Sequence, residues 1–425
     1  MTIYWAPLLH IYQPPTQDAN VLKSINKECY EPLLTILNEC DFAKFTLNIN
    51  AVLIELLIEN ELFTTLHLLK NLVSEDKIEI TGNAKYHPIL PLIPRKEAYH
   101  QIQLNEELIK REFGSSWQRK GFFPPEMAIS PNIAKYVQDL GYKWIIQSGI
   151  AFPGDRYKIN WPLDVIYCIP TGLQLFFRDD ILSNKISFKH TTAKEFVNDI
   201  KNLHNDNDNQ NDTYIITAMD GETFGHHIKN YENTFLKKVL DMISNEEEIH
   251  MSFISTLDTK FPLSDQKIIP KKSSWSTTGD DLTNGIFYPL WDHPTNKIHM
   301  YYWKMLRSLA QLMNLADKLD LTGNWEAINY RTTARWFYDK SFCSDTTWWA
   351  NPPNLWSPNM IYKGIILLMK AALNAHLALL KANIKKAEGY FDAISYYHGL
   401  LLMEISSMSQ PPKKALEKEF NNDKL

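Results

Sequence analysis

Short apolar runs alternate with amphipathic stretches over about the first 260 residues, and no other feature constrains the fold of this chain as much. Ile3–Leu9, Lys44–Ile49 and Lys77–Ile80 have the length and composition of short buried strands. Val52–Leu57 and Phe63–Val73 lie between the last two and carry apolar residues at the spacing of a helix face. Strand, helix and strand in repetition predict parallel βαβ units, arranged as an open sheet or a barrel.

One repeat of this pattern carries clear signals at its ends. Ser130 is a suitable N-cap, Pro131 occupies the first helical position, and Gly141 follows the last helical residues. The strand Tyr142–Gln147 comes next, and a later apolar run, Tyr214–Ala218, predicts another strand. These signals support the βαβ assignment.

The pattern changes at about residue 298, where the strands end and long helices begin. Apolar residues recur at three- and four-residue spacing in four stretches, Met300–Leu321, Trp325–Asp339, Met360–Ala382 and Ala387–Ser407. We therefore predict two domains, an α/β domain of residues 1–297 and a helical domain of residues 298–425.

Charge and composition argue against several classes of partner. The net charge of −5 and the lack of a long basic run make nucleic acid an unexpected partner. No apolar stretch approaches the length of a membrane span, and the amino terminus lacks the basic and apolar regions of a signal peptide. The cysteines are scattered without the spacing of a metal site or a disulfide framework: Cys29, Cys40, Cys168 and Cys343. We expect a reduced, cytoplasmic protein that binds neither nucleic acid nor a membrane.

Polar and aromatic residues gather directly after four predicted strands. They are His10, Tyr12 and Gln13 after the first, His87 after the third, Glu126 after Gly121–Phe123, and Asp220, Glu222, His226 and His227 after Tyr214–Ala218. In parallel α/β architectures, ligands bind at the carboxyl ends of the strands, where the loops carry functional side chains. A single carboxylate after a strand is usually a helix cap, but four clusters at successive strand ends predict one shared site.

Two of these residues, Glu126 and Asp220, have the chemistry of a glycoside-cleaving site. Such a site needs one carboxyl group that protonates the leaving oxygen and a second that attacks the anomeric carbon or activates water. The proton donor needs a raised pKa while its partner stays ionised, and apolar neighbours and nearby charges can arrange both. Pro124, Pro125 and Met127 give Glu126 a rigid, partly apolar frame. The residue types leave open which of the two carboxylates attacks.

Five segments together resemble the five short regions of glycoside hydrolase family 57, in the same order and over most of the chain. The segments are His10-Ile11-Tyr12-Gln13-Pro14, Gly82 to Pro94, the stretch around Glu126, Asp220-Gly221-Glu222-Thr223-Phe224-Gly225-His226, and Ser344-Asp345-Thr346-Thr347-Trp348-Trp349. One segment alone would be a weak signal, whereas five in order with both carboxylates present are specific. Tyr12 stands where the family often has a second histidine, which predicts a different subsite preference.

This resemblance implies distinct roles for the carboxylates. It implies Glu126 as the nucleophile and Asp220 as the general acid/base of a retaining enzyme. Glu222 would be a supporting carboxylate, and His87 would contact the substrate. The resemblance also implies an incomplete (β/α)7 barrel followed by a C-terminal helical bundle, α-glucans as the substrate, and no required metal or other cofactor. Hydrolysis and transfer to an acceptor sugar both remain open.

Aromatic side chains are further candidates for the site, because they stack on the apolar faces of sugar rings. The chain has 12 Trp and 20 Tyr residues. Trp275 lies in a polar loop rich in Ser and Thr and is the favoured stacking platform. By the resemblance, Asp345 and Trp348 belong to the helical domain and contribute to the rim of the active site.

Two other functions are compatible with these residues. A metal-dependent enzyme similar to the polysaccharide deacetylases would need a His and Asp ligand set, to which His10, His87 and His226 could contribute. A non-catalytic glucan-binding relative would bind saccharides without turnover. The presence of both carboxylates favours the enzyme over either alternative.

Overall fold

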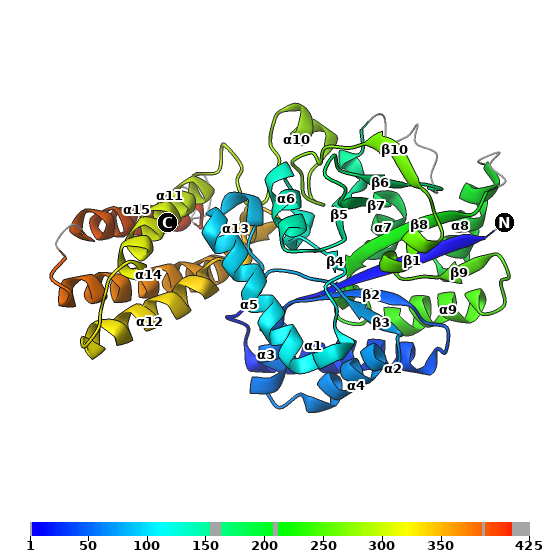
Figure 1. Cartoon of the computed structure of the whole chain (residues 1–425), viewed down its shortest axis with the longest axis horizontal. Coiled ribbons are helices and arrows are strands. Elements are labelled where there is room, and N and C mark those ends of the chain that lie inside the picture. Colours follow the sequence, from blue (N-terminus) through cyan, green and yellow to red (C-terminus); the bar gives the residue numbers. More distant parts are fainter. Residues whose placement is uncertain (1, 154–162, 207–210, 385–386, 410–425) are drawn as a thin grey trace, which may run out of the picture. The chain divides into compact units, whose positions relative to one another are not determined.

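The computed structural model describes residues 2–153, 163–206, 211–384 and 387–409 (Figure 1). The chain divides into two compact units, Met1–Tyr288 and Pro289–Leu425. The first unit carries two five-stranded sheets with their helices, and the second is built mainly from long helices. The predicted order of an α/β region followed by a helical region is confirmed, and the long helices begin at Lys297, close to the change in the sequence pattern.

The first sheet has the order β3-β2-β1-β8, with parallel neighbours throughout and β9 paired with the start of β1. Its strands are β1 (Ile3–Ile11), β2 (Phe45–Ile49), β3 (Ile78–Ile80), β8 (Thr213–Asp220) and β9 (Ile249–Met251). Four of these strands were predicted, with ends that differ by no more than two residues. Their apolar runs identified them because strands of a parallel sheet are buried on both faces.

The second sheet has the order β10-β6-β7-β5-β4, and all neighbours are parallel except β6 and β7. Its strands are β4 (Gly121–Phe122), β5 (Trp144–Ser148), β6 (Ile166–Cys168), β7 (Gln174–Arg178) and β10 (Leu263–Lys267). Strands β6, β7 and β10 were not predicted. Most side chains of β10 are exposed, so it has no apolar run.

Two backbone contacts join the two sheets. Gly82, shortly after β3, forms a parallel bridge with Phe122 of β4. The Asp179 amide, directly after β7, donates to the Ile216 carbonyl of β8 over 2.8 Å. Each contact places a strand of one sheet beside a strand of the other.

Helices follow most of the strands and cover the sheets. In the first unit they are α1 (Ala19–Ile25), α2 (Glu31–Glu39), α3 (Ala51–Glu59), α4 (Phe63–Ser74), α5 (Arg95–Phe113), α6 (Pro131–Asp139), α7 (Asp180–Ser187), α8 (Ala193–Asp206), α9 (Lys238–Ile243) and α10 (Gly279–Thr283). Ser130 caps α6 as predicted, because its Oγ accepts from the Ile133 amide at 3.4 Å. Helices α2, α3 and α4 lie along the same side of β1, β2 and β3 (Figure 1).

Strand β1 sends alternate side chains into two different cores. The core between the first sheet and its helices takes Ile3, Trp5, Leu9 and Ile11. The core on the other face takes Ala6 and Leu8, together with Ile146, Phe176, Ile216 and Ala218 from β5, β7 and β8. We call this second face the inner face. Because side chains alternate along a strand, His10 continues the row of Ala6 and Leu8 on the inner face.

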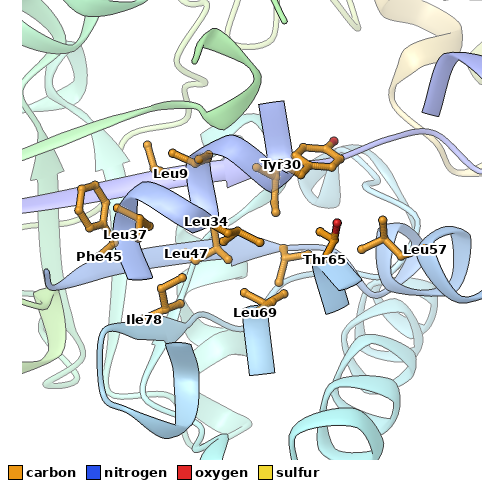
Figure 2. A pocket seen from close by; sticks show the side chains of 13 residues that line it. Leu9, Tyr30, Leu34, Leu37, Phe45, Leu47, Leu57, Thr65, Leu69 and Ile78 are labelled. Atoms are coloured by element: carbon orange, nitrogen blue, oxygen red, sulfur yellow. The ribbon is translucent and has the colours of Figure 1, made fainter. Parts of the chain in front are cut away.

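An apolar hollow lies in the core on the helix-covered face of the first sheet (Figure 2). Its lining is almost entirely aliphatic and includes Leu9, Leu34, Leu47 and Leu69. Tyr30 stands at one end, and Figure 2 shows its hydroxyl oxygen directed away from the aliphatic side chains. Sugar sites need several polar groups that orient the ligand, so this hollow belongs to the packed core.

The second unit packs four long helices, α11 (Lys297–Asp317), α12 (Trp325–Ser341), α14 (Pro358–Lys381) and α15 (Glu388–Met408). A short helix, α13 (Asp345–Trp348), and a hairpin of β11 (Ala350–Asn351) and β12 (Leu355–Trp356) lie between α12 and α14. Helix α14 is long and apolar enough to cross a membrane, so the expectation that no stretch approaches that length is wrong. Half of its most apolar stretch is buried against neighbouring helices, as in the core helix of a bundle.

Candidate active site

Strand register brings polar side chains together on the inner face. His10 of β1 lies opposite Asp220 of β8 on one side and opposite Asn48 of β2 on the other. Asp220 continues the row of Ala218, just as His10 continues the row of Leu8, so these polar residues lie at the carboxyl ends of strands that carry the inner core. His10 Nδ1 lies 2.6 Å from Asn48 Oδ1.

The Asp220 carboxyl stands at the end of β8 and remains partly exposed. Loss of hydration raises its pKa above the ordinary value, and the positive charge of Arg178 opposes this rise. An aspartic acid with a raised pKa keeps its proton to a higher pH than one on the surface. A general acid needs this property.

Arg178 is a buried cation at the carboxyl end of β7. Its Nε donates to the Ala218 carbonyl over 2.7 Å, and its other nitrogens donate to Asp180 Oδ1 at 3.0 Å and Asn184 Oδ1 at 2.9 Å. These bonds fix the guanidinium, and its backbone acceptor, Ala218, lies two residues before Asp220 in the sequence. Arg178 therefore supplies a fixed positive charge next to the partly exposed carboxyl.

Glu126 lies in a turn with an unusual backbone, the 3-10 segment Pro125–Met127. Its φ is 58°, and Met127 follows with a φ of 47°. His87 is a third residue of this kind, with a φ of 55°. A left-handed backbone at a non-glycine residue costs about 1–3 kcal/mol and persists where the surrounding structure imposes it, most often at functional sites. The backbone therefore supports a functional role for Glu126.

Two ring systems contact the Glu126 carboxylate. Trp275 Nε1 donates to Oε2 over 2.7 Å, and the Trp275 amide donates to the Glu126 carbonyl over 3.1 Å. His87 Nδ1 lies 3.6 Å from Oε1. Burial, and then the neighbouring His10, hold the pKa of His87 well below its ordinary value, so a neutral imidazole meets the carboxylate. Trp275, predicted as a stacking platform, thus also holds Glu126.

His10, Tyr12 and His87 form a stack of rings. The ring centroids of Tyr12 and His87 are 4.1 Å apart, and those of His10 and His87 are 5.0 Å apart. Phe123 packs on His10 at 5.3 Å, and Trp275 meets it edge-on at 5.8 Å. Burial also lowers the pKa of His10, so each imidazole is neutral at neutral pH and can donate one hydrogen bond and accept another.

The Glu222 carboxylate is buried just beyond Asp220. One oxygen, Oε1, accepts from the Tyr12 amide at 3.2 Å, from Gln13 Nε2 at 3.3 Å and from the Tyr30 hydroxyl at 2.6 Å. Burial, followed by the charge of Asp220, raises the pKa of Glu222 to about 7. The neighbouring charge of Asp220 thus disfavours the ionised form of Glu222.

Arg178, Asn48 and Tyr30 are neighbours of the predicted residues that the sequence did not single out. The apolar run Leu173–Phe177 directly before Arg178 is a strand signal that could have identified it. Asn48 likewise lies one residue before the end of β2. Tyr30 offers no such signal, since it lies in a helical segment and meets Glu222 across 192 positions of the sequence.

His226 and His227 lie in the loop that follows Asp220. His226 Nδ1 is 3.1 Å from Glu28 Oε2, and His227 is exposed. The prediction that both bind substrate stays a prediction.

Asp345 and Trp348 belong to α13 of the second unit. Cys343 Sγ lies 2.8 Å from Asp345 Oδ2, and the Trp348 ring packs edge-on against Trp349 at 4.7 Å. Their contribution to the rim of the active site stays a prediction.

The deacetylase alternative requires a cluster of metal ligands. In the part of the chain that the structure describes, no group of three or more His, Cys, Asp or Glu side chains could hold a metal ion. His10 and His87 stack on each other, whereas His226 is paired with Glu28. The four cysteines are free thiols.

The fold and the site define an α/β protein with a two-carboxylate, ring-lined site at the carboxyl ends of its strands. The model of glycosyl hydrolase family 57 matches residues 7–269, which include His10, Glu126 and Asp220. The chain therefore belongs to glycosyl hydrolase family 57.

Curated relatives are similar to much of the chain. An alpha-amylase of Pyrococcus horikoshii is 23% identical over 374 residues, which cover 80% of this chain and 55% of the relative. A 4-alpha-glucanotransferase of Thermococcus litoralis is 23% identical over 263 residues, which cover 60% of this chain and 38% of the relative. The chain thus spans about half the length, or less, of these curated relatives.

Solved structures share the fold. The Thermococcus litoralis 4-alpha-glucanotransferase has a TM-score of 0.65 at 20% identity, covering 89% of this chain and 60% of that one. A branching enzyme of Pyrococcus horikoshii has a TM-score of 0.70 at 15% identity, covering 95% of this chain and 94% of that one. An alpha-amylase of Thermotoga maritima has a TM-score of 0.67 at 14% identity, covering 97% and 100%.

Proposed function

We propose that this protein cleaves or transfers α-glucan chains through a glycosyl-enzyme intermediate. The observation that carries the proposal is the pairing of two carboxyl groups in different environments. Asp220 has a raised pKa, while Glu126 accepts a hydrogen bond from Trp275 Nε1 at 2.7 Å. Two carboxyl groups whose environments differ in this way suit the roles of acid and nucleophile. Membership of a family that includes an alpha-amylase and a 4-alpha-glucanotransferase supports the choice of substrate.

The proposed reaction has two displacements. Asp220 gives its proton to the glycosidic oxygen while a Glu126 oxygen attacks the anomeric carbon, so the bond to the leaving sugar breaks and a glycosyl ester forms. Water or a sugar hydroxyl then attacks the same carbon, the ester bond breaks, and Asp220 takes up the proton of the attacking hydroxyl. Two inversions restore the original anomeric configuration. The two carboxyl groups are expected about 5–5.5 Å apart in this mechanism.

The neutral rings around the carboxylates would bind the sugar in this mechanism. His10 donates through Nδ1 to Asn48 Oδ1 and keeps Nε2 as an acceptor, while the neutral His87 ring carries one donor and one acceptor. Both rings therefore suit sugar hydroxyl groups. Tyr12 and Trp275 remain partly exposed, so the substrate can reach their faces or edges. We assign these four residues, with Gln13 and Glu222 behind them, to the binding of the sugar at the cleavage point.

We also propose that the strands of the first unit form an incomplete (β/α)7 barrel. The seven mutually parallel strands would follow one another as β1, β2, β3, β4, β5, β7 and β8. The bridge between Gly82 and Phe122 supports the step from β3 to β4. The bond from the Asp179 amide to the Ile216 carbonyl supports the step from β7 to β8, which in turn pairs with β1. The inner face would then be the barrel interior, and its carboxyl end would hold the site.

The experiment that tests the activity is incubation with maltooligosaccharides of several lengths, followed by separation of the products by size. Shorter products alone are expected from hydrolysis, and longer products as well from transfer, because the two outcomes differ only in the acceptor. A folded protein that leaves every chain length unchanged would overturn the proposal.

A Glu126→Gln variant separates an enzyme from a glucan-binding protein. The amide has nearly the same shape but cannot form the ester, so turnover should be abolished while saccharide binding, measured by calorimetry, persists. The matched control is Glu97→Gln, a buried carboxyl on α5 outside the proposed site. Equal turnover in wild type and Glu126→Gln would contradict the nucleophile assignment.

A further inference from the structure

Three consecutive residues, Glu28, Cys29 and Tyr30, contact the loop that follows Asp220. They end a π-helical turn, Asn26–Tyr30, inserted between α1 and α2. Turns of this kind are rare, and many of those known lie at functional sites. We call Glu28, Cys29 and Tyr30 the clasp residues.

Each clasp residue meets a different part of the loop. The Glu28 carboxylate pairs with His226 and Lys229, the Cys29 thiol donates to the Gly221 carbonyl over 3.2 Å, and the Tyr30 hydroxyl donates to Glu222 Oε1 over 2.6 Å. The contact extends to the backbone at Gly225, where a Cβ atom would lie 1.9 Å from the Glu28 carbonyl oxygen. Only glycine fits this approach, and Gly225 also has a φ of 115°.

The sequence supplies a reason for the irregular turn. Pro32 lies in the first turn of α2 and has no amide hydrogen, so the carbonyl of Glu28, four residues earlier, loses its usual α-helical donor. The Glu31 amide bonds instead to the Asn26 carbonyl, five residues back. Asn26 is itself anchored, because its side chain accepts from Thr65 of α4 at 2.6 Å and donates to Glu31 at 2.8 Å.

Tyr30 joins the helix-covered core to the carboxylates. Its ring is buried at the end of the apolar hollow (Figure 2), and its hydroxyl accepts from Gln13 Nε2 at 3.1 Å while it donates to Glu222. The packed ring leaves the hydroxyl little freedom, so Glu222 is held in one orientation beside Asp220. A neutral donor in this position stabilises the charged form of Glu222.

We propose that Tyr30 is a positioning residue of the active site, which orients Glu222 and sets the proton balance between Glu222 and Asp220. This inference rests on the proposed function, in which Asp220 is the acid/base. The titratable groups that face Glu222 are Asp220 from β8 and both Tyr30 and Cys29 from the π-helical turn. Tyr12 contacts Glu222 through its backbone amide.

The test is a Tyr30→Phe variant, which keeps the ring in the hollow and removes only the hydroxyl. The pKa of Glu222, followed by carboxyl-carbon NMR, should rise by about one unit, since the variant loses a hydrogen bond to the charged form. With maltooligosaccharides, kcat should fall by about tenfold with KM within about twofold, and the pH–rate limb nearest neutrality should move to higher pH.

The matched control is Tyr231→Phe. Tyr231 is also buried, stacks at 5.8 Å on Phe224 of the same loop region, and bonds only weakly to the Thr191 carbonyl at 3.4 Å. It should leave both the titration of Glu222 and the pH–rate profile unchanged. Should Tyr30→Phe fail to fold, Gln13→Leu removes another donor to the same oxygen and is expected to shift the titration in the same direction.

The outcomes separate this inference from the proposed function. An unchanged Glu222 titration in folded Tyr30→Phe overturns the positioning role, whatever the activity. A wild-type protein without activity on any α-glucan overturns the proposed function, while the titration still decides the role of Tyr30. If Tyr30 acts through Glu222, Tyr30→Phe should cause little further loss of activity in a Glu222→Gln background. A loss as large as the one that Tyr30→Phe causes in the wild type would count against the inference.

Discussion

The two carboxylates of the site are held by different means. Glu126 lies in a short left-handed turn after Pro124 and Pro125, and Trp275 donates to it through both its ring and its backbone. Asp220 ends a long buried strand with an ordinary extended backbone, at φ −63° and ψ 131°. The Glu126 carboxylate is fixed by a left-handed backbone and by contacts from Trp275 and His87. Asp220 is placed by strand register with His10, and the charge of Arg178 acts on it.

This difference matches two chemical tasks. A nucleophile must point at one carbon atom, so a rigid turn and a direct hydrogen bond to its carboxylate are useful. A general acid/base must change its protonation state during the reaction, so its surroundings must tune a pKa. Around Asp220, loss of hydration raises the pKa and the charge of Arg178 opposes the rise.

The largest expected effect is that of Glu126→Ala, which removes the oxygen proposed to attack the anomeric carbon. Turnover of α-glucans should fall by at least about 1,000-fold. With an aryl α-maltooligoside and added azide, the product should be the β-glycosyl azide, because azide enters from the face that Glu126 has left. An α-azide from this variant would mean that the two carboxylates have exchanged roles.

Asp220→Ala is expected to have the next largest effect, a loss of about 100- to 1,000-fold on natural glucans. Azide should now give the α-glycosyl azide, since the intermediate on Glu126 still forms. In the wild type, the raised pKa means that Asp220 loses its proton only at a pH above its ordinary range, and kcat/KM should fall as pH rises through that value. This falling limb should be absent from the variant, as measured with an aryl glycoside that needs little protonation.

Trp275→Phe tests whether the Glu126 turn needs its hydrogen bond. The ring remains, but the donor 2.7 Å from Glu126 Oε2 is lost, and kcat should fall by about tenfold. The control is Trp303→Phe in the second unit, where the indole donates to the Trp291 carbonyl over 2.8 Å. Equal losses in the two variants would show that the effect of Trp275 is on folding and not on the carboxylate.

The smallest expected effect is that of removing the Glu28 charge, which pairs with His226 and Lys229 of the loop after Asp220. The bonds from Lys229 and His226 lower the pKa of Glu28 to about 2. A depressed pKa contributes stability above the unfolded-state pKa, near 4.5, and this contribution is lost as pH falls through the folded value. Because Lys229 is exposed and Glu28 and His226 are partly exposed, Glu28→Gln should lower Tm by only about 1–2 °C at pH 7.

The gap in Tm between wild type and Glu28→Gln should close as the pH approaches about 2, which calorimetry across pH can measure. Asp139→Asn is the control, since it breaks the exposed pair with Lys135 on α6, away from the loop. A gap that stays constant down to the lowest pH would mean that the charge of Glu28 does not fasten the loop.

Much of the site followed from local patterns. The run that precedes Asp220 predicted a strand, and β8 ends at that residue. The side-chain alternation of β1 likewise places His10 above the inner core, because the period of two is a property of any strand. In each case the information lay within a few residues of the position concerned.

The sequence by itself indicated β1, β2, β3, β4, β5 and β8, the polar residues after them and the two carboxylates, because strand period and strand ends are local properties. Only the tertiary structure decided which partners hold the carboxylates of Glu126 and Glu222. Trp275 reaches Glu126 across 149 positions, and Tyr30 reaches Glu222 across 192. Burial and neighbouring charge set the pKa values of Asp220 and Glu222, and both depend on which distant segments pack around the strand ends. No pattern along the chain records those contacts.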